Sequence, residues 1–254
     1  MAANKERLDV ALVRRGLAAS RERARAIIMA GQVYVGDQLV DKPGTLIQLD
    51  VDCHVAQATP ELKYVSRGGI KLERALDTFQ LNPTGLIAID VGASTGGFTQ
   101  CLLEHGAQRV YAVDVGYGQL AWELRNDPRV VVMERTNIRH LASLPEPMQC
   151  AAIDVSFISL RLVLPALVPL LTLAAETWIV ALVKPQFEAG KAEADRGGGI
   201  ISDPYVHSRV LRELQEWISQ HTPLEVAGQI DSPIRGREGN CEFLFLLKFR
   251  STEA

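Results

Sequence analysis

The chain has 254 residues, 47% of them hydrophobic, and a formal net charge of −3 at pH 7. This length allows one large domain or two smaller ones with proper apolar cores. Charged residues near the N-terminus argue against a signal peptide, and the most apolar stretch, residues 162–175, is too short to span a bilayer and contains two prolines. The four cysteines show no metal-ligand spacing. We therefore expect a cytoplasmic protein without a membrane segment or a required metal.

The first 60 residues predict a small α+β domain. Apolar residues at helical spacing indicate one helix that Gly16 ends and a second that begins after Ser20 and ends at Gly31. Alternating residues around Gly36 predict a hairpin, and residues 45–55 supply one or two further strands.

This domain also carries an excess of basic residues in a recognisable order. The stretch RLDVALVRRGLAASRERARAIIMAGQVYVGDQLVDKPGTLI resembles the RNA-binding module of small-subunit ribosomal protein S4. The resemblance implies that basic side chains bind RNA, whereas the alternative is that they only solvate a helix face. The candidate RNA-binding residues are Arg7, Arg14, Arg21, Arg25 and, in a later turn, Arg67.

A second domain is predicted over residues 67–254, after a linker at 61–66. It opens with a turn and a helix over residues 71–79. Lys71 lies in the first turn of that helix, where the helix dipole disfavours a cation. We therefore treat Lys71 as a candidate functional residue rather than a solvated one.

From residue 86 the chain alternates strands and helices, which is typical of a mostly parallel, doubly wound sheet. The final two strands are expected to form an antiparallel hairpin at its edge. The predicted strands are 86–90, 109–114, 130–133, 150–154, 178–183, 224–230 and 241–249, and the predicted helices are 97–104, 119–125, 159–173 and 203–220.

The turn after the first of these strands, DVGASTGGFT, is typical of a ligand site. It contains G-x-S-x-G, but a hydrolase elbow needs several strands before it, and His207 or His221 could complete a triad only by accident of position. A nicotinamide dinucleotide would require a glycine where Ser94 stands. The glycines instead suit S-adenosylmethionine, with an acidic residue about 20 positions on for the ribose. The candidate cofactor-binding residues are Asp90, Gly92, Ser94, Gly96, Gly97, Asp114 and Asn137, the last of which could equally be a helix cap.

Charged residues lie at the ends of three later strands of the predicted sheet: Asp154 and Lys184 end two of them, and Glu242 opens the last one. Parallel strands deliver such residues to one edge, so we expect them to lie near Lys71. Taken alone, each of these residues could have a purely structural role, as a helix cap or a solvated strand end.

Five segments together resemble the TlyA-type (haemolysin A) ribosomal RNA methyltransferases, relatives of the FtsJ-type 2′-O-methyltransferases: YVSRGGIKLERAL, DVGASTGGFTQCLL, AIDVSFISL, LVKPQFEAG and SPIRGREGNCEFL. The resemblance implies an RNA-binding domain followed by a Rossmann-like, S-adenosylmethionine-dependent methyltransferase fold. It implies 2′-O-methylation of cytidine in ribosomal RNA, free or in ribosomal subunits. The catalytic tetrad that it implies is Lys71, Asp154, Lys184 and Glu242.

The sequence leaves two questions open, the role of Lys184 and the choice among rival functions, and it predicts one mobile segment. Lys184 acts either as a general base or only as a group that positions the hydroxyl. The rival functions are a membrane-active haemolysin and an RNA-binding protein with an inactive methyltransferase domain. Residues 188–203 are rich in glycine and charge and are predicted to form a mobile loop.

Overall fold

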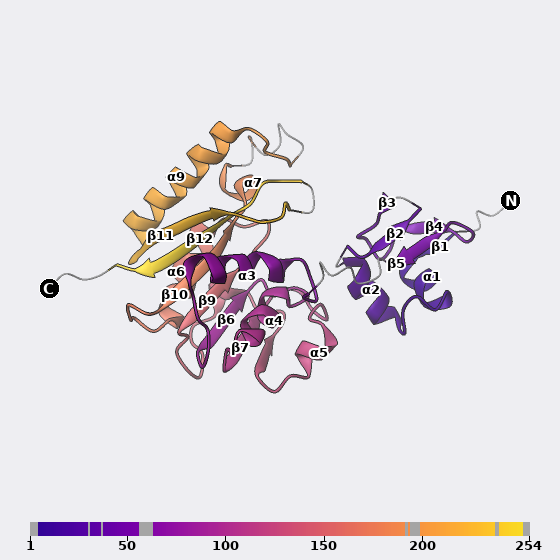
Figure 1. Cartoon of the computed structure of the whole chain (residues 1–254), viewed down its shortest axis with the longest axis horizontal. Helices are drawn as coiled ribbons and strands as arrows, with labels where there is room; N and C mark the ends of the chain where they lie inside the picture. The colour runs from indigo at the N-terminus through magenta and orange to yellow at the C-terminus, as the bar shows by residue number, and fades with distance from the viewer. Residues whose placement is uncertain are drawn as a thin grey trace. The chain divides into compact units, whose positions relative to one another are not determined.

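The computed structural model describes residues 5–29, 31–36, 38–55, 63–190, 193, 199–236 and 239–250 (Figure 1). It divides into two compact units, Met1–Arg67 and Gly68–Ala254. Residues 61–62 of the predicted linker, and residues 191–192 and 194–198 of the predicted loop at 188–203, lie outside the described residues.

The first unit packs two helices on short antiparallel strands. Its elements are β1 Lys5–Arg7, α1 Leu8–Arg14, α2 Arg21–Met29, β2 Val33–Val35, β3 Gln38–Leu39, β4 Leu46–Gln48 and β5 Cys53–Val55. β1 pairs with β4, and β2 lies between β3 and β5. The strand β1 was not predicted, because three charged residues give no apolar pattern.

The turn residues of this unit act as the sequence indicated. The Ser20 hydroxyl accepts a hydrogen bond from the N–H of Arg23 at 3.1 Å and so caps α2. Gly16, Gly31 and Gly36 all have positive φ, a conformation that glycine adopts without strain. The buried core comes from α1, α2, β2, β4 and β5.

The second unit is built on a seven-stranded sheet in the order β11-β12-β10-β9-β6-β7-β8. Its strands are β6 Ile87–Val91, β7 Arg109–Val113, β8 Val130–Met133, β9 Cys150–Ile153, β10 Trp178–Val183, β11 Leu224–Asp231 and β12 Phe243–Phe249. β6 to β10 run parallel, and β12 pairs antiparallel with both β10 and β11. The predicted mostly parallel sheet with terminal antiparallel strands is confirmed.

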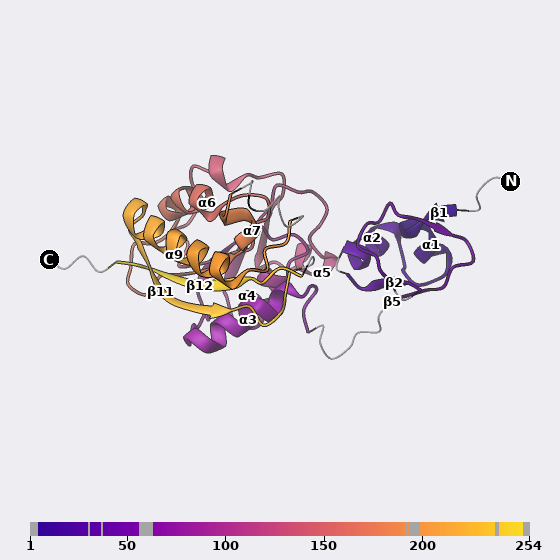
Figure 2. The same cartoon turned by 90° about the horizontal axis from the view of Figure 1, so that it is seen from above.

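Helices cover both faces of this sheet. They are α3 Gly68–Phe79, α4 Gly97–Glu104, α5 Trp122–Arg125, α6 Leu160–Leu167, α7 Pro185–Glu188 and α9 Pro204–His221, with 3₁₀ turns at η1 Ile138–His140 and η2 Val168–Leu170. Figure 2 shows α6 and α9 on one face, where they share the large apolar core, and α3 and α4 on the other. No helix in the described part of the chain is both long and apolar enough to cross a bilayer.

Two predicted helices are shorter in the structure. The helix expected over residues 159–173 ends at Leu167 and continues as the turn η2, in whose first turn Pro169 lies. Proline lacks the N–H that an α-helix would need there. The helix expected over residues 119–125 keeps only Trp122–Arg125, because residues 116–120 form the turn that leaves β7.

The strand order places a topological switch point between β6 and β9. The chain leaves β6 toward β7 and β8 on one side and returns to β9 on the other side. In open parallel sheets, ligands bind where the strand order reverses in this way, beyond the carboxyl ends of the strands. The turn after β6 and Asp154 after β9 lie at this point.

Candidate active site

The turn that follows β6 lies directly against the end of β9. Gly92 has a φ of 89°, and a Cβ at this position would lie 2.3 Å from the backbone oxygen of Asp154. Only glycine therefore permits the two strand ends to approach this closely. Gly96 also has positive φ and precedes α4, whose first residue is Gly97.

Asp114 ties this turn to the turn after β7. Its Oδ2 accepts a hydrogen bond from the N–H of Ser94 at 2.8 Å, and its Oδ1 accepts one from the N–H of Gly116 at 2.6 Å. Ser94 itself has a positive φ of 49°. Each carboxylate oxygen keeps a second lone pair, so Asp114 can still accept hydrogen bonds from a ligand.

Asp90 lies beneath the turn and is fully buried. Its Oδ2 accepts a hydrogen bond from the Thr99 hydroxyl at 2.7 Å, and its Oδ1 has no hydrogen-bond partner among the described residues. Burial raises the pKa of Asp90 to about 7, and the nearby charge of Asp154 adds to the rise. Any part that Asp90 takes in ligand binding therefore acts through the turn above it.

The four predicted catalytic residues form two ion pairs. Lys71 Nζ, from α3, lies 2.5 Å from Glu242 Oε2, just before β12, and both residues are buried. Lys184 Nζ, after β10, lies 2.6 Å from Asp154 Oδ1. An isolated buried charge is strongly unfavourable, and pairing each ammonium with a carboxylate removes most of that penalty.

Two supporting residues escaped the sequence analysis. The Ser156 hydroxyl accepts a hydrogen bond from Lys184 Nζ at 2.9 Å. Glu188, on α7, accepts hydrogen bonds from the Ser159 hydroxyl and the Leu160 N–H at the start of α6, and burial raises its pKa. Both residues stand inside segments quoted for the family resemblance, which was the available signal.

Phe157 is the third residue that the sequence analysis missed. Its side chain is 90% exposed and its φ is 63°, a conformation that is unfavourable for an aromatic residue. Its ring centroid lies 5.1 Å from that of Phe187 on α7. A strained, exposed aromatic three positions after Asp154 indicates a surface that contacts a ligand.

Asn137 has the alternative role that the sequence left open. Its side-chain oxygen accepts a hydrogen bond from the N–H of Arg139 at 3.0 Å and caps η1. This contact fixes its oxygen in a local turn, and its amide nitrogen remains the group that a ligand could use.

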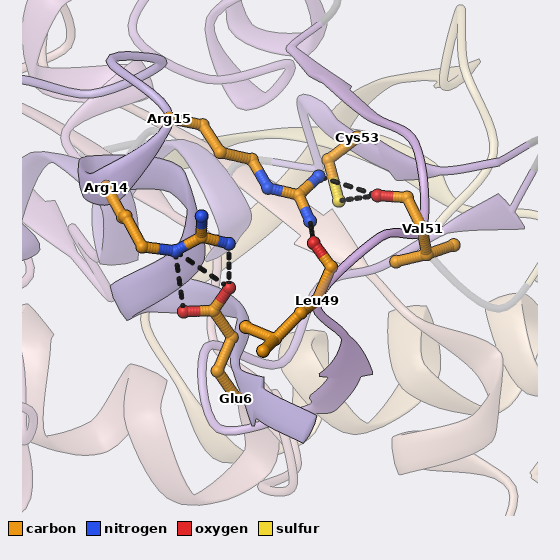
Figure 3. Close-up of polar contacts among 6 residues, drawn as sticks. All are labelled: Glu6, Arg14, Arg15, Leu49, Val51 and Cys53. Carbon is orange, nitrogen blue, oxygen red and sulfur yellow. Dashed lines mark hydrogen bonds and ion pairs between the residues drawn. The ribbon is translucent and has the colours of Figure 1, made fainter. Parts of the chain in front are cut away.

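The arginines of the first unit differ in what holds them. Arg14 pairs with Glu6, while Arg15 donates to the backbone oxygens of Leu49 and Val51, as Figure 3 shows. Arg15 is thus a structural residue that fastens α1 to the segment between β4 and β5.

The other candidate RNA-binding arginines are exposed to different degrees. Arg7 and Arg21 both pair with the buried carboxylate of Asp9. Arg25 and Arg67 are exposed.

Comparison with known proteins places this chain in a family. A model of the FtsJ-like methyltransferases matches residues 64–249, and a model of the S4 domain matches residues 6–52. The chain therefore belongs to the FtsJ-like methyltransferases. Its 44% identity to a TlyA protein over 99% of its length places it among the TlyA-type members.

Three relatives support this assignment. YqxC of Bacillus subtilis, described as a "putative rRNA methyltransferase", is 51% identical over 97% of this chain and 87% of its own. The "16S/23S rRNA (cytidine-2'-O)-methyltransferase TlyA" of Mycobacterium tuberculosis is 44% identical over 99% of this chain and 93% of its own. A solved structure described as a "putative hemolysin" from Streptococcus thermophilus has a TM-score of 0.73 and 44% identity, covering 98% of this chain and 90% of that one.

A methyl group at Gly92 tests the contact between β6 and β9. Gly92→Ala should lower the free energy of unfolding by about 3 kcal/mol, because it adds both left-handed strain and a clash with Asp154. The matched control is Gly85→Ala, where φ is 75° but nothing lies within 4 Å of the added atom. This control should lose only about 1 kcal/mol in denaturant unfolding. Equal losses in the two variants would contradict the close approach.

The buried carboxyl of Asp90 makes a prediction about pH. An acid whose pKa rises on folding lowers stability increasingly as pH rises from its unfolded pKa to its folded pKa of about 7. Asp90→Asn removes this loss, because the amide does not ionise and its oxygen can still accept from Thr99. Between about pH 5 and about pH 8, wild type should lose about 2.5 kcal/mol more stability than the variant in denaturant unfolding. Parallel pH profiles would refute the assignment.

Proposed function

We propose that this protein transfers a methyl group from S-adenosylmethionine to the 2′-hydroxyl of a cytidine in ribosomal RNA. The observation that carries the proposal is the pairing of Lys71 with Glu242 and of Lys184 with Asp154 at the switch point of a methyltransferase sheet. The choice of cytidine and of ribosomal RNA rests on the printed name of the TlyA relative.

The cofactor part of the proposal is supported by the turn after β6. Gly92 lets this turn lie against the backbone of Asp154, and backbone hydrogen bonds from Gly92 and Ala93 to Val113 hold the turn in place. Asp114 is partly exposed at the end of β7, where its remaining lone pairs can accept the ribose hydroxyls of a nucleoside. These residues fit S-adenosylmethionine, which supplies an already activated methyl group.

The chemistry left to the chain is alignment and charge control. As the 2′-oxygen forms its bond to the methyl carbon, the bond from that carbon to sulfur breaks and the hydroxyl proton must leave. Lys184 Nζ is fixed by Asp154 and Ser156, which leaves one direction of a three-donor ammonium for the 2′-oxygen. We propose that Lys184 orients that oxygen and stabilises its developing negative charge. Lys71, held by Glu242, is proposed to tune Lys184 and to hold RNA.

RNA is the substrate class that the first unit supports. Its S4 domain match and its exposed arginines suit a polyanion, and the match to ribosomal RNA methyltransferases points to ribosomal RNA, free or within a subunit. A protein that modifies this RNA would work in the cytoplasm.

Replacement of Lys184 tests the function directly. Lys184→Ala should lower labelled methyl transfer from S-adenosylmethionine to isolated ribosomal subunits or free ribosomal RNA by about 100-fold or more. The matched control is Lys248→Ala, which should retain activity. Lys248 lies opposite Trp178, at the end of β10 away from Lys184. Mapping of the methylated product identifies the nucleotide.

Two outcomes would point to a different function, and a third would change the role of Lys184. Wild type that binds RNA without transferring methyl would support an RNA-binding protein with an inactive second unit. Leakage of liposomes at modest protein concentration, without methyl transfer, would support the haemolysin. In single turnover, a rate that rises through an ionisation absent from Lys184→Arg would make Lys184 a general base instead.

Phe157 is the proposed contact for the target base. Stacking of a base on an aromatic ring contributes about 1–3 kcal/mol, so Phe157→Ala should lower methyl transfer about 10-fold or more. Phe157→Tyr keeps the ring and should retain most activity. Both variants should unfold at the wild-type temperature, since the side chain is exposed. Equal activity of wild type and Phe157→Ala would remove Phe157 from the site.

A further inference from the structure

One buried carboxylate in the first unit holds two exposed arginines. Asp9 is 0% exposed, and its Oδ1 accepts from Arg7 Nε at 2.9 Å. Its Oδ2 accepts from Arg7 Nη2 and from Arg21 Nη2, both at 3.0 Å. The two arginine side chains are 48% and 59% exposed. The group therefore has its anion inside and its cations outside.

The surroundings of Asp9 keep this arrangement in place. Asp9 lies in the first turn of α1, where the helix dipole favours a negative charge, and its backbone N–H donates to the oxygen of Pro43 at 3.1 Å. A Cβ on Gly44 would lie 3.3 Å from Arg7 Nη1, so this glycine leaves room for the guanidinium. Hydrogen bonds from Arg7 and then from Arg21 hold the pKa of Asp9 below its usual value, so the carboxylate stays charged.

The charge balance separates this group from Arg14 and Arg15 at the end of α1. Arg14 pairs with Glu6 one to one, and Arg15 is engaged by backbone oxygens. Around Asp9, two guanidinium groups share one carboxylate and leave one net positive charge at the surface. Arg7 gives Asp9 two of its five N–H groups and Arg21 gives one, so several donors remain for an anion outside.

We infer that Asp9 is a positioning residue that fixes Arg7 and Arg21 as a two-pronged clamp for one phosphate of an RNA backbone. Two guanidinium groups repel each other when free, and ordering two long side chains on binding opposes affinity. A shared buried carboxylate offsets the repulsion and orders both side chains before RNA binds. This inference deepens the proposed function, since it takes RNA as the ligand.

The decisive experiment is Asp9→Asn in the full chain, without cofactor, measured by fluorescence anisotropy on a labelled RNA hairpin of mixed sequence. Loss of a negative charge should by itself strengthen RNA binding. A clamp predicts the opposite, a Kd about 5-fold weaker at physiological salt, because the arginines lose their common anchor. Tighter binding by Asp9→Asn would overturn the inference.

A matched control separates position from charge. Glu22→Gln removes the same charge from an exposed residue adjacent to Arg21 on α2 and should leave binding unchanged or slightly tighter. Arg21→Lys keeps the charge but loses the planar fork, and it should weaken binding about as much as Arg21→Ala. Wild-type affinity in Arg21→Lys would contradict the clamp, and since Arg21 is exposed, this variant stays informative if Asp9→Asn unfolds.

A double-mutant cycle excludes a purely structural role for Asp9. If Asp9 acts through the arginines, Asp9→Asn should change Kd little in a chain that already carries Arg7→Ala and Arg21→Ala. An undiminished effect in that background would overturn the inference. Methyl transfer is scored separately: an active wild type whose Asp9→Asn variant binds RNA normally rejects only the clamp, while tight RNA binding without methyl transfer rejects only the proposed enzyme.

Discussion

The backbone contact between the turn after β6 and the end of β9 places Asp154 directly against the proposed cofactor turn. The two strands are parallel neighbours, and the chain departs from them on opposite sides. Because Gly92 lacks a side chain, the backbone of Asp154 can lie in direct contact with the turn. The surface proposed for the cofactor and the pair of Asp154 and Lys184 thus lie at one edge of the sheet. A transfer between two bound molecules requires such a geometry.

Charge pairing is the second constraint, and it explains why the site contains two lysines and two carboxylates. Lys71 and Glu242 are both buried, and neither charge would be tolerated there alone. Removing Lys71 or Glu242 therefore leaves its partner unpaired, so a single replacement in this pair also changes the local structure. The pairs also bring together elements far apart in the chain, since Lys71 and Glu242 are separated by 171 positions.

The sequence predicted the sheet well, because buried parallel strands are apolar runs bounded by polar turns; β8 and β10 have the predicted limits. Helix ends were less predictable, as the early end of α6 near Pro169 shows. The sequence identified the four charged candidates but not which lysine pairs with which carboxylate, since pairing depends on strand order. Ser156 and Glu188 were missed because their contacts arise from the turns around α6 and α7.

The two units differ in the ratio of carboxylates to cations. In the second unit each lysine has its own carboxylate, so the two pairs carry no net charge. In the first unit Asp9 is shared by Arg7 and Arg21, which leaves a net positive surface. A neutral, fixed set suits a reaction that must control one developing charge, whereas an excess of fixed cations suits the retention of a polyanion. The ratio of carboxylates to cations, more than the number of cations, distinguishes the proposed methyl-transfer site from the proposed RNA-binding surface.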